Sequence, residues 1–300
     1  MIIIWQVLSL ICMLTFATQN LVVKALTRNG VRVKFILWAL VAVAVPFLLV
    51  AYLLSAPHQF LPGFGTALFF AVLGNILGFY GYVRAIRLAE VSLVMPLLSL
   101  TPFFMLLTSW VMLAEFPDLF GLLGILGVVG GTYLLTRKPG SSGLEPFYAL
   151  WKNPGCRWAL LTAFVWSIQA NIDKFGVAYS NPIGYTFWFH ILFSVLLLPF
   201  IFIGEFKLLE VDQLRVKGNL NFFSKIMGGL ILVGSLQALM TIVQMIAIME
   251  TQVSYVIAIK RSGMLFVVLF GGIFFDEKYT LRRFLAAVVV FAGLLGILLR

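Results

Sequence analysis

Long apolar runs separated by short polar connections fill almost the whole chain. A helix that crosses a membrane needs about 20 mainly apolar residues, and ten stretches meet that need. They are residues 4–23, 35–54, 64–83, 91–113, 119–136, 158–176, 184–204, 226–248, 253–275 and 281–299. The pattern predicts an all-α integral membrane protein with ten transmembrane helices and almost no room for a soluble domain.

The same pattern occurs twice along the chain. Residues 85–135 recur without a gap as residues 247–297, at a constant offset of 162 positions. The residues kept in register include polar and small ones, namely Ser92 with Ser254, Glu115 with Glu277, and Gly131 with Gly293. We therefore expect two repeats of five helices, residues 1–140 and 156–300, joined by a linker at residues 141–155.

Five helices per repeat is an odd number, so the second repeat enters the membrane in the opposite sense from the first. Proteins built from such inverted repeats hold a substrate site near the membrane midplane, between two halves that rock against each other. Glycines recur in the third, fifth and tenth segments, where we expect them to let helices pack closely.

Composition supports the membrane assignment, because 62% of the residues are hydrophobic and only 11% are charged, against roughly a quarter charged in soluble domains. The first apolar segment lacks a basic start and a small-residue cleavage site, so we interpret it as a retained helix. We expect a multi-pass protein of a bacterial-type plasma or inner membrane, with the lipid bilayer and a small molecule as partners. The pattern leaves a monomer or a homodimer open.

Enzyme chemistry finds little support. The two cysteines and two histidines predict neither disulfides nor a metal site. The motifs of ATP-binding loops, zinc proteases and serine hydrolases are absent. We therefore expect no catalytic residues, no metal and no cofactor, and any pumping must draw on a gradient.

The basic residues are segregated along the chain. Of the 21 lysines and arginines, 17 fall in alternate connections, beginning with the one between the first two helices. The opposite side has only Lys174 and Arg300, and Lys260 and Arg261 lie within an apolar segment. Because basic loops face the cytoplasm, we expect both termini outside. This arrangement fits a membrane orientation signal and not nucleic-acid binding.

The repeats carry residues typical of a known family. These are Ala85, Ile86, Val91, Ser92, Pro96, Leu97, Thr101, Pro102, Glu115, Gly121, Gly124 and residues 131–134, then residues 258–262, residues 274–277 and Gly293. Together they resemble the signature of the EamA-like branch of the drug/metabolite transporter (DMT) superfamily, over essentially the whole chain. The resemblance implies a secondary transporter, often an exporter of amino acids, other metabolites or drugs, with a central cavity lined by both repeats. Ten-helix members usually have cytoplasmic termini, and the charges here depart from that.

Lys260 and Arg261 are the most distinctive candidate residues. They are the eighth and ninth residues of their apolar segment, about 12–13 Å deep at 1.5 Å per residue. A basic side chain near the bilayer centre costs at least about 3 kcal/mol, so it needs water, a counter-charge or a ligand. We expect one of them, preferably Arg261 with its planar fork, to bind a carboxylate or phosphate. The alternative is a structural cation that snorkels or pairs internally.

Polar side chains at matching places in the two repeats suggest a pseudo-symmetric site. The candidates are Gln19, Gln169 and Asn171 in the first helices of the repeats, and Asn75 and Gln237 in the third, with Gln244 nearby. Trp166 could line the same pocket. Hydrogen bonds between helices are the alternative role for the amides.

Two titratable residues are candidates for coupling transport to protons. His190 changes charge near neutral pH, and Asp173 lies in the sixth apolar segment. A structural role is the alternative for both. Glu115 and Glu277 each precede the last helix of a repeat, where we expect a carboxylate to meet the positive end of a helix.

These patterns favour a gradient-driven or facilitative carrier of a small metabolite, preferably a carboxylate such as an amino acid, that works by alternating access. A flippase or membrane enzyme acting on a phosphate-bearing, lipid-linked substrate is the alternative. A polytopic scaffold without a solute site is the third class, and the paired intramembrane amides argue against it.

Overall fold

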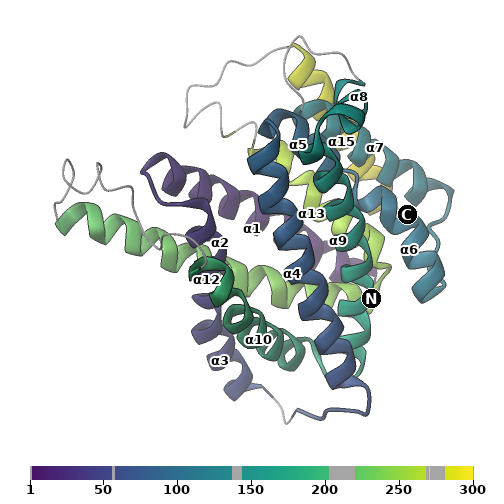
Figure 1. Ribbon diagram of the computed structural model, residues 1–300. Helices are drawn as coiled ribbons and strands as arrows, with labels where there is room; N and C mark the ends of the chain where they lie inside the picture. The colour runs from purple at the N-terminus through teal and green to yellow at the C-terminus, as the bar shows by residue number, and fades with distance from the viewer. Residues whose placement is uncertain are drawn as a thin grey trace.

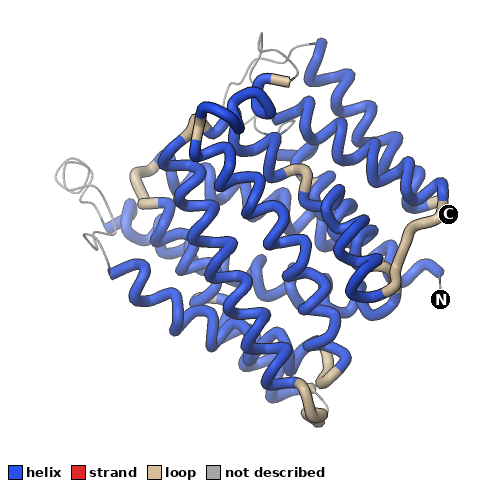
Figure 2. Tube along the Cα trace, turned by 45° about the vertical axis from the view of Figure 1, so that its right-hand side comes forward, coloured by secondary structure: helices blue, strands red, loops and turns tan. Residues whose placement is uncertain are grey.

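The computed structural model describes residues 2–55, 58–136, 144–202, 220–267, 270 and 281–299. These residues are mostly helical, with short loops and turns, and contain no β-strand (Figure 2). In chain order the helices are α1 (Ile2–Arg28), α2 (Val33–Ala42), α3 (Ala44–Leu54), α4 (Phe64–Leu88), α5 (Val91–Leu98), α6 (Thr101–Leu113), α7 (Leu119–Thr136), α8 (Glu145–Lys152), α9 (Pro154–Ala178), α10 (Pro182–Phe202), α12 (Leu220–Glu250), α13 (Val253–Ser262) and α15 (Leu281–Leu298) (Figure 1).

Membrane-spanning length and apolarity are met by six of the described helical segments: α1, α2 with α3, α4, α5 with α6, α10 and α12. The apolar helices α7 and α15 are shorter. The all-α, multi-pass membrane architecture is therefore confirmed, while the number of ten spans stays a prediction. Helices α9 and α13 are not among the six, and they carry half of the candidate polar residues.

Two of the predicted spans are each broken into two helices. The segment 35–54 is interrupted at Val43, between α2 and α3, and the segment 91–113 at Ser99 and Leu100, between α5 and α6. Proline follows each break, as Pro46 and Pro102. Because proline lacks the backbone N–H that a helix interior uses, the break leaves it near the start of the next helix, where none is needed.

The ninth predicted span is broken at the matching place in the repeat. Helix α13 ends at Ser262, Gly263 forms a turn, and residues 264–267 are helical again. Gly263 stands 162 positions after Thr101, which starts α6. A Cβ at Gly263 would lie 2.7 Å from the backbone oxygen of Met13 in α1, so glycine permits this close approach. The rest of the predicted span, residues 268–275, lies largely outside the described residues.

Helices from the two repeats pack against each other in pairs. Helix α1 lies along α12, α4 along α9, and α7 along α15. Exchanging the first repeat for the second converts the α1–α12 pair into the α9–α4 pair and leaves the α7–α15 pair in place. The contacts therefore follow the internal repeat of the sequence.

The predicted close packing of glycine-rich helices is confirmed at α7 and α15. A Cβ at Gly127 would lie 3.0 Å from the Cα of Gly293, and one at Gly124 would lie 2.8 Å from the oxygen of the same residue. Side chains at these positions would force the two helices apart.

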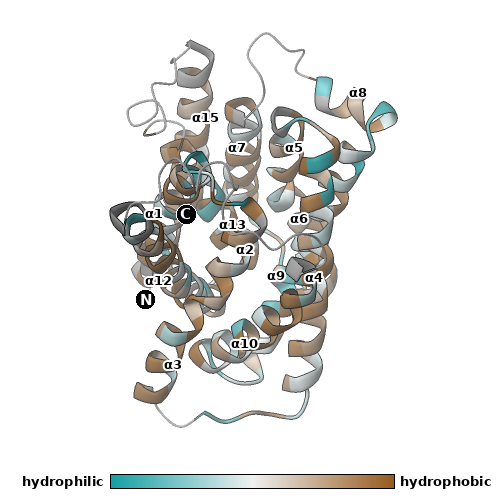
Figure 3. Ribbon diagram, turned by 60° about the vertical axis from the view of Figure 1, so that its left-hand side comes forward, coloured by the Kyte–Doolittle hydropathy of each residue, from teal (hydrophilic) through white to brown (hydrophobic). Residues whose placement is uncertain are grey.

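The linker contains a helix that the sequence analysis did not predict. Helix α8 lies within residues 141–155, and Asn153 after it caps α9 by accepting a hydrogen bond from the Gly155 N–H at 2.8 Å. Figure 3 shows hydrophilic colours on α8, whereas α3 and much of α4 are hydrophobic. Residues 137–143, 203–219 and 271–280, with Glu277, lie outside the described residues.

Both termini lie at the same end of the bundle. The Gln6 Nε2 donates a hydrogen bond to the Leu298 carbonyl at 2.6 Å, and the marked ends are neighbours in Figure 2. This arrangement requires the chain to cross the bundle an even number of times.

Candidate functional site

Polar side chains from both repeats enclose a cavity in the centre of the bundle, where α13 lies among α1, α4 and α9 (Figure 1). It consists of two adjoining spaces of about 320 Å³ and about 140 Å³. We call them together the central cavity. Both spaces are lined by the same five polar residues, namely Asn75, Asp173, Gln237, Gln244 and Lys260. Phe16, Trp166, Gln169 and Arg261 line the larger space, and Tyr185 and His190 the smaller.

Lys260 and Arg261 enter the cavity from the last turn of α13. The carboxyl end of a helix carries partial negative charge, which stabilises cations there. The Lys260 Nζ donates a hydrogen bond to Gln244 Oε1 at 2.7 Å. Helix α13 ends inside the protein because of the break at Gly263, so the break places both cations in the cavity.

Aromatic rings lie beside the two cations. The Arg261 Cζ is 6.0 Å from the ring centre of Phe16 and 5.8 Å from that of Trp166, and the Lys260 Nζ is 5.8 Å from Phe16. Ring faces attract cations at such distances. In the part of the chain that the structure describes, neither cation forms an ion pair with a carboxylate. Their positive charge is therefore available to an anionic ligand.

Asp173 contributes the opposite charge to the same cavity. Its Oδ1 accepts hydrogen bonds from the Tyr185 hydroxyl at 2.5 Å and from the Gln169 Nε2 at 2.7 Å. The bond to Asp173 fixes which end of the Gln169 amide is nitrogen. Its other end, Oε1, is buried and has no hydrogen-bond partner among the described residues. A buried acceptor without a partner is costly, so a ligand with a donor would stabilise it.

Glycines of α4 make room for the residues that α9 contributes. A Cβ at Gly74 would lie 2.5 Å from Gln169 Oε1, and one at Gly78 would overlap the Trp166 indole. The sequence analysis treated these glycines as packing positions, and here the packing also shapes the cavity.

A chain of hydrogen bonds crosses the smaller space. The Gln19 Nε2 donates to Gln237 Oε1 at 2.9 Å, and the Gln237 Nε2 lies 3.5 Å from the His190 Nε2. The other His190 nitrogen, Nδ1, lies 2.8 Å from the Thr186 carbonyl oxygen, which can only accept. His190 therefore donates from Nδ1 and accepts from Gln237 at Nε2, as a neutral ring does. Gln19 lies behind Gln237 and does not line the cavity.

Asn171 lies away from the central cavity. It accepts a hydrogen bond from the Ser109 hydroxyl at 2.7 Å and donates to Thr108 Oγ1 and the Ser167 carbonyl, each at 3.1 Å. The bonds with Ser109 and Thr108 join α9 to α6, which is the alternative role that the sequence analysis gave to the amides.

Sequence reasoning missed Phe16 and Tyr185. Phe16 is one of 29 phenylalanines, and nothing in the sequence distinguishes it. Tyr185 meets Asp173 across the turn between α9 and α10, a contact that no motif signals.

A cluster of polar contacts closes the bundle at the end near the termini. Glu115 Oε1 accepts from Lys174 Nζ at 2.5 Å, and Glu115 Oε2 accepts from the Val253 N–H at 3.1 Å. Lys174 Nζ also donates to the Thr251 carbonyl at 2.9 Å. We call these four residues the Glu115 cluster. The sequence analysis expected Glu115 at the start of the last helix of its repeat, but it meets the start of α13.

The start of α7 is capped by a different carboxylate. Asp118 Oδ1 accepts a hydrogen bond from the Gly121 N–H at 2.7 Å. Glu115 does not cap α7, and its contacts connect the first repeat to the second. The other members of the Glu115 cluster, Lys174, Thr251 and Val253, all belong to the second repeat.

The apolar helices and the polar, charged cavity that both repeats line define a multi-pass membrane protein of the transporter type. The pattern of the EamA-like transporter family matches residues 3–137 and again residues 153–299. The chain belongs to the EamA-like transporter family, within the DMT superfamily.

One solved structure, described only as "Crystal structure of protein", is similar over 97% of this chain and 97% of its own, with a TM-score of 0.68 and 17% sequence identity. At that identity the similarity shows the fold alone. No curated protein matches the chain. The family comparison lends no support to the alternative of a lipid-linked substrate.

Proposed function

We propose that this protein is a secondary carrier for a small metabolite that bears a carboxylate, such as an amino acid. The observation that carries the proposal is the central cavity, in which Lys260 and Arg261 have no carboxylate partner among the described residues. A carboxylate bound there would neutralise charge that is otherwise costly inside a membrane.

Two acceptors from α9 in the same cavity favour a substrate that also carries hydrogen-bond donors. Gln169 Oε1 lacks a partner in the described part of the chain, and Asp173 is an acceptor beside it. An amino group could bind to these two oxygens while the carboxylate binds to Arg261. Trp166 and Phe16 add aromatic surface to the same space, beside the cations.

Ten helices in two inverted repeats would give the cavity access to each side of the membrane in turn. The Glu115 cluster supports this mechanism, because it joins the repeats at the end near the termini and would have to separate when that end opens. The broken helices α5–α6 and α13 supply the places where each repeat can bend.

The experiment is a comparison of transport by the wild type, Arg261→Ala and Arg87→Ala. Arg87 is an exposed arginine in the last turn of α4 and does not line the cavity. Medium and cytoplasm from cells with matched membrane levels are profiled for metabolites. Each metabolite that redistributes is then assayed for saturable flux in proteoliposomes.

We expect one carboxylate-bearing solute to move with the wild type and Arg87→Ala and to lose most of its flux with Arg261→Ala. A solute that all three proteins transport equally would contradict the role of Arg261, but it would still support the carrier function. Proteoliposomes without saturable flux of any small organic solute would contradict the carrier itself.

A further inference from the structure

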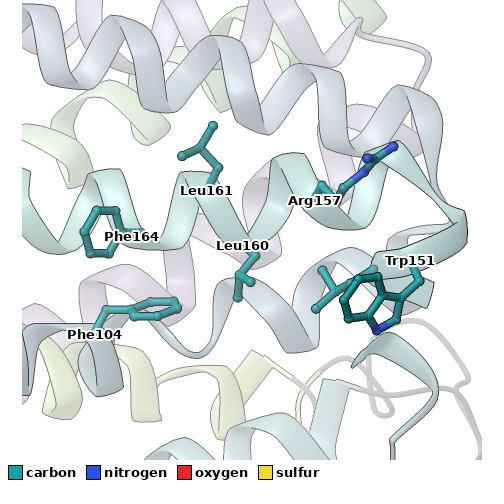
Figure 4. Close-up of a pocket in the computed structure, with 7 residues that line it drawn as sticks. Phe104, Trp151, Arg157, Leu160, Leu161 and Phe164 are labelled. Atoms are coloured by element: carbon teal, nitrogen blue, oxygen red, sulfur yellow. The ribbon is translucent and has the colours of Figure 1, made fainter. Parts of the chain in front are cut away.

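A second cavity lies on the outer surface of the bundle, away from the central cavity. It has a volume of about 600 Å³ and is formed by α6, α8 and α9. Its lining includes Phe104, Trp151, Arg157, Leu160, Leu161 and Phe164 (Figure 4). We call it the outer groove. In Figure 4, Arg157 and Trp151 lie at one end of it and Phe104 and Phe164 at the other.

The position of the groove along α9 relates it to the membrane surface. Arg157 is in the first turn of α9, and Gly155 packs against Leu88 and Ala89 at the end of α4, where Arg87 is exposed. This end of the bundle carries the basic residues and lies opposite the Lys174–Glu115 contact. Phe164 follows Arg157 by seven residues, which is about 10 Å along a helix. The groove therefore runs from the level of the lipid headgroups into the apolar part of one leaflet, which is about 15 Å thick.

The charge at the shallow end of the groove is positive. Among the residues described, no carboxylate or other hydrogen-bond acceptor pairs with Arg157, and the first turn of α9 has no acidic residue. The guanidinium group binds phosphate with two parallel hydrogen bonds. Both the arginine and the positive end of the helix favour an anion at this place.

Helix α8 closes the groove at the level of the membrane surface. Its apolar and charged residues are separated on two faces, and Trp151 on it is 88% exposed. Short amphipathic helices lie in the interface plane, and tryptophan is enriched at that depth. The deeper end of the groove is aliphatic and aromatic, as an acyl chain requires.

We propose that the outer groove binds an anionic phospholipid of the surrounding leaflet. The phosphate lies against Arg157, and one acyl chain runs past Leu160 and Leu161 to the contact between Phe104 and Phe164, whose ring centres are 5.7 Å apart. This site is independent of the proposed transport cavity, since the two share no lining residue.

Trp151 provides a direct test, because brominated acyl chains quench tryptophan fluorescence at short range. The full-length protein is reconstituted in phosphatidylcholine vesicles with increasing fractions of brominated phosphatidylglycerol or brominated phosphatidylcholine. The signal of Trp151 is obtained by subtracting the signal of Trp151→Phe. The same series is measured for Arg157→Gln and, as a control at the same end of the bundle, Arg87→Gln.

We expect brominated phosphatidylglycerol to quench Trp151 at about fivefold lower mole fraction than brominated phosphatidylcholine, the factor expected for one basic residue at an anionic surface. Arg157→Gln should remove this preference, and Arg87→Gln should keep it. Equal quenching by both lipids in the wild type, or a preference that survives Arg157→Gln, would overturn the proposal. If neither lipid quenches Trp151, the proposal is also overturned, because a second copy of the chain would then cover the groove.

Discussion

Single glycines determine how much space the central cavity has beside α9. Gly74 and Gly78 face Gln169 and Trp166 so closely that a methyl group would displace either side chain. Gly65, the second residue of α4, has no such neighbour within 4 Å. The three positions have the same residue in the same helix and differ in their surroundings.

Gly78→Ala should therefore reduce both stability and transport, whereas Gly65→Ala should reduce neither. Overpacking at Gly78 is expected to lower the free energy of unfolding by about 1–3 kcal/mol. An alanine at Gly65 should change it by no more than about 1 kcal/mol and can raise it, because alanine favours helix. Unfolding in detergent and substrate flux in proteoliposomes measure the two effects. Equal losses in both variants would mean that the contact with Trp166 is unimportant.

Asp173 and His190 differ in what their surroundings allow them to do. Asp173 lines both spaces of the cavity, together with Lys260, and accepts from Tyr185. Both ring nitrogens of His190 have partners that suit a neutral imidazole.

If transport depends on pH through this cavity, Asp173→Asn should remove the dependence and His190→Gln should preserve it. Glutamine at position 190 keeps a partner for Gln237, whereas asparagine at position 173 cannot change its charge. Initial rates of flux measured across a pH series test both variants. A flat pH profile in His190→Gln with a normal profile in Asp173→Asn would assign coupling to the histidine.

At the scale of elements, the broken helix α13 carries two cations that its counterpart in the first repeat lacks. The break at Gly263 matches the one before Thr101, but the positions that match Lys260 and Arg261 are Leu98 and Ser99. The two half-helices are thus alike in backbone and different in charge. The sequence analysis predicted the cations, because a charge within an apolar run is visible along the chain.

The breaks themselves were not predicted, although Pro46, Pro102 and Gly263 stand beside them. Apolar residues resume after each break, and the predicted spans were defined by their overall apolarity alone. The contacts of Phe16 and Tyr185 could not be predicted from the sequence, because each residue contacts a side chain on another helix. Sequence therefore predicted the all-α, multi-pass architecture and the family, and it named several residues that line the cavity, but it did not predict the bends between them.

The Glu115 cluster stabilises the contact between the two repeats. We expect that exchanging the charges of Glu115 and Lys174 would not restore the stability that is lost when the cluster is broken. Glu115→Gln is expected to lower the free energy of unfolding by about 1–3 kcal/mol, because a partly buried ammonium loses its charged partner. Glu115→Lys combined with Lys174→Glu keeps a charge pair. That pair still leaves the Val253 N–H and the Thr251 carbonyl without the partners they have now. Full recovery of stability in the double variant would show that charge alone matters.

Considered as a whole, the molecule has a basic end and an end with few charges. Arg87 and Arg157 lie at the basic end, and Lys174 at the other end is neutralised by Glu115. The termini share the end of the Glu115 cluster, since Trp5 stacks on Tyr255 at 6.3 Å, close to Val253.

We accordingly predict that both termini face away from the cytoplasm, opposite to the usual orientation in the family. Basic residues are retained on the cytoplasmic side during insertion. Alkaline phosphatase fused to the C-terminus should be active and green fluorescent protein at the same place dark. A fluorescent, phosphatase-negative pair of fusions would show the usual orientation.

The packing of α9 against the first repeat has a consequence for biogenesis. A solitary α9 would expose Asp173 and Lys174, which lie near its carboxyl end, to lipid. A charge costs about 2.5–3.5 kcal/mol at a helix centre and less towards the end, so both residues still oppose insertion. In the folded protein α4 and α6 cover this helix, and Glu115 neutralises its lysine. During synthesis the first repeat leaves the ribosome earlier, so α9 meets these partners as it enters the bilayer. Residues 153–299 produced alone should then insert poorly and be degraded, and separate production of residues 1–152 in the same cell should rescue them.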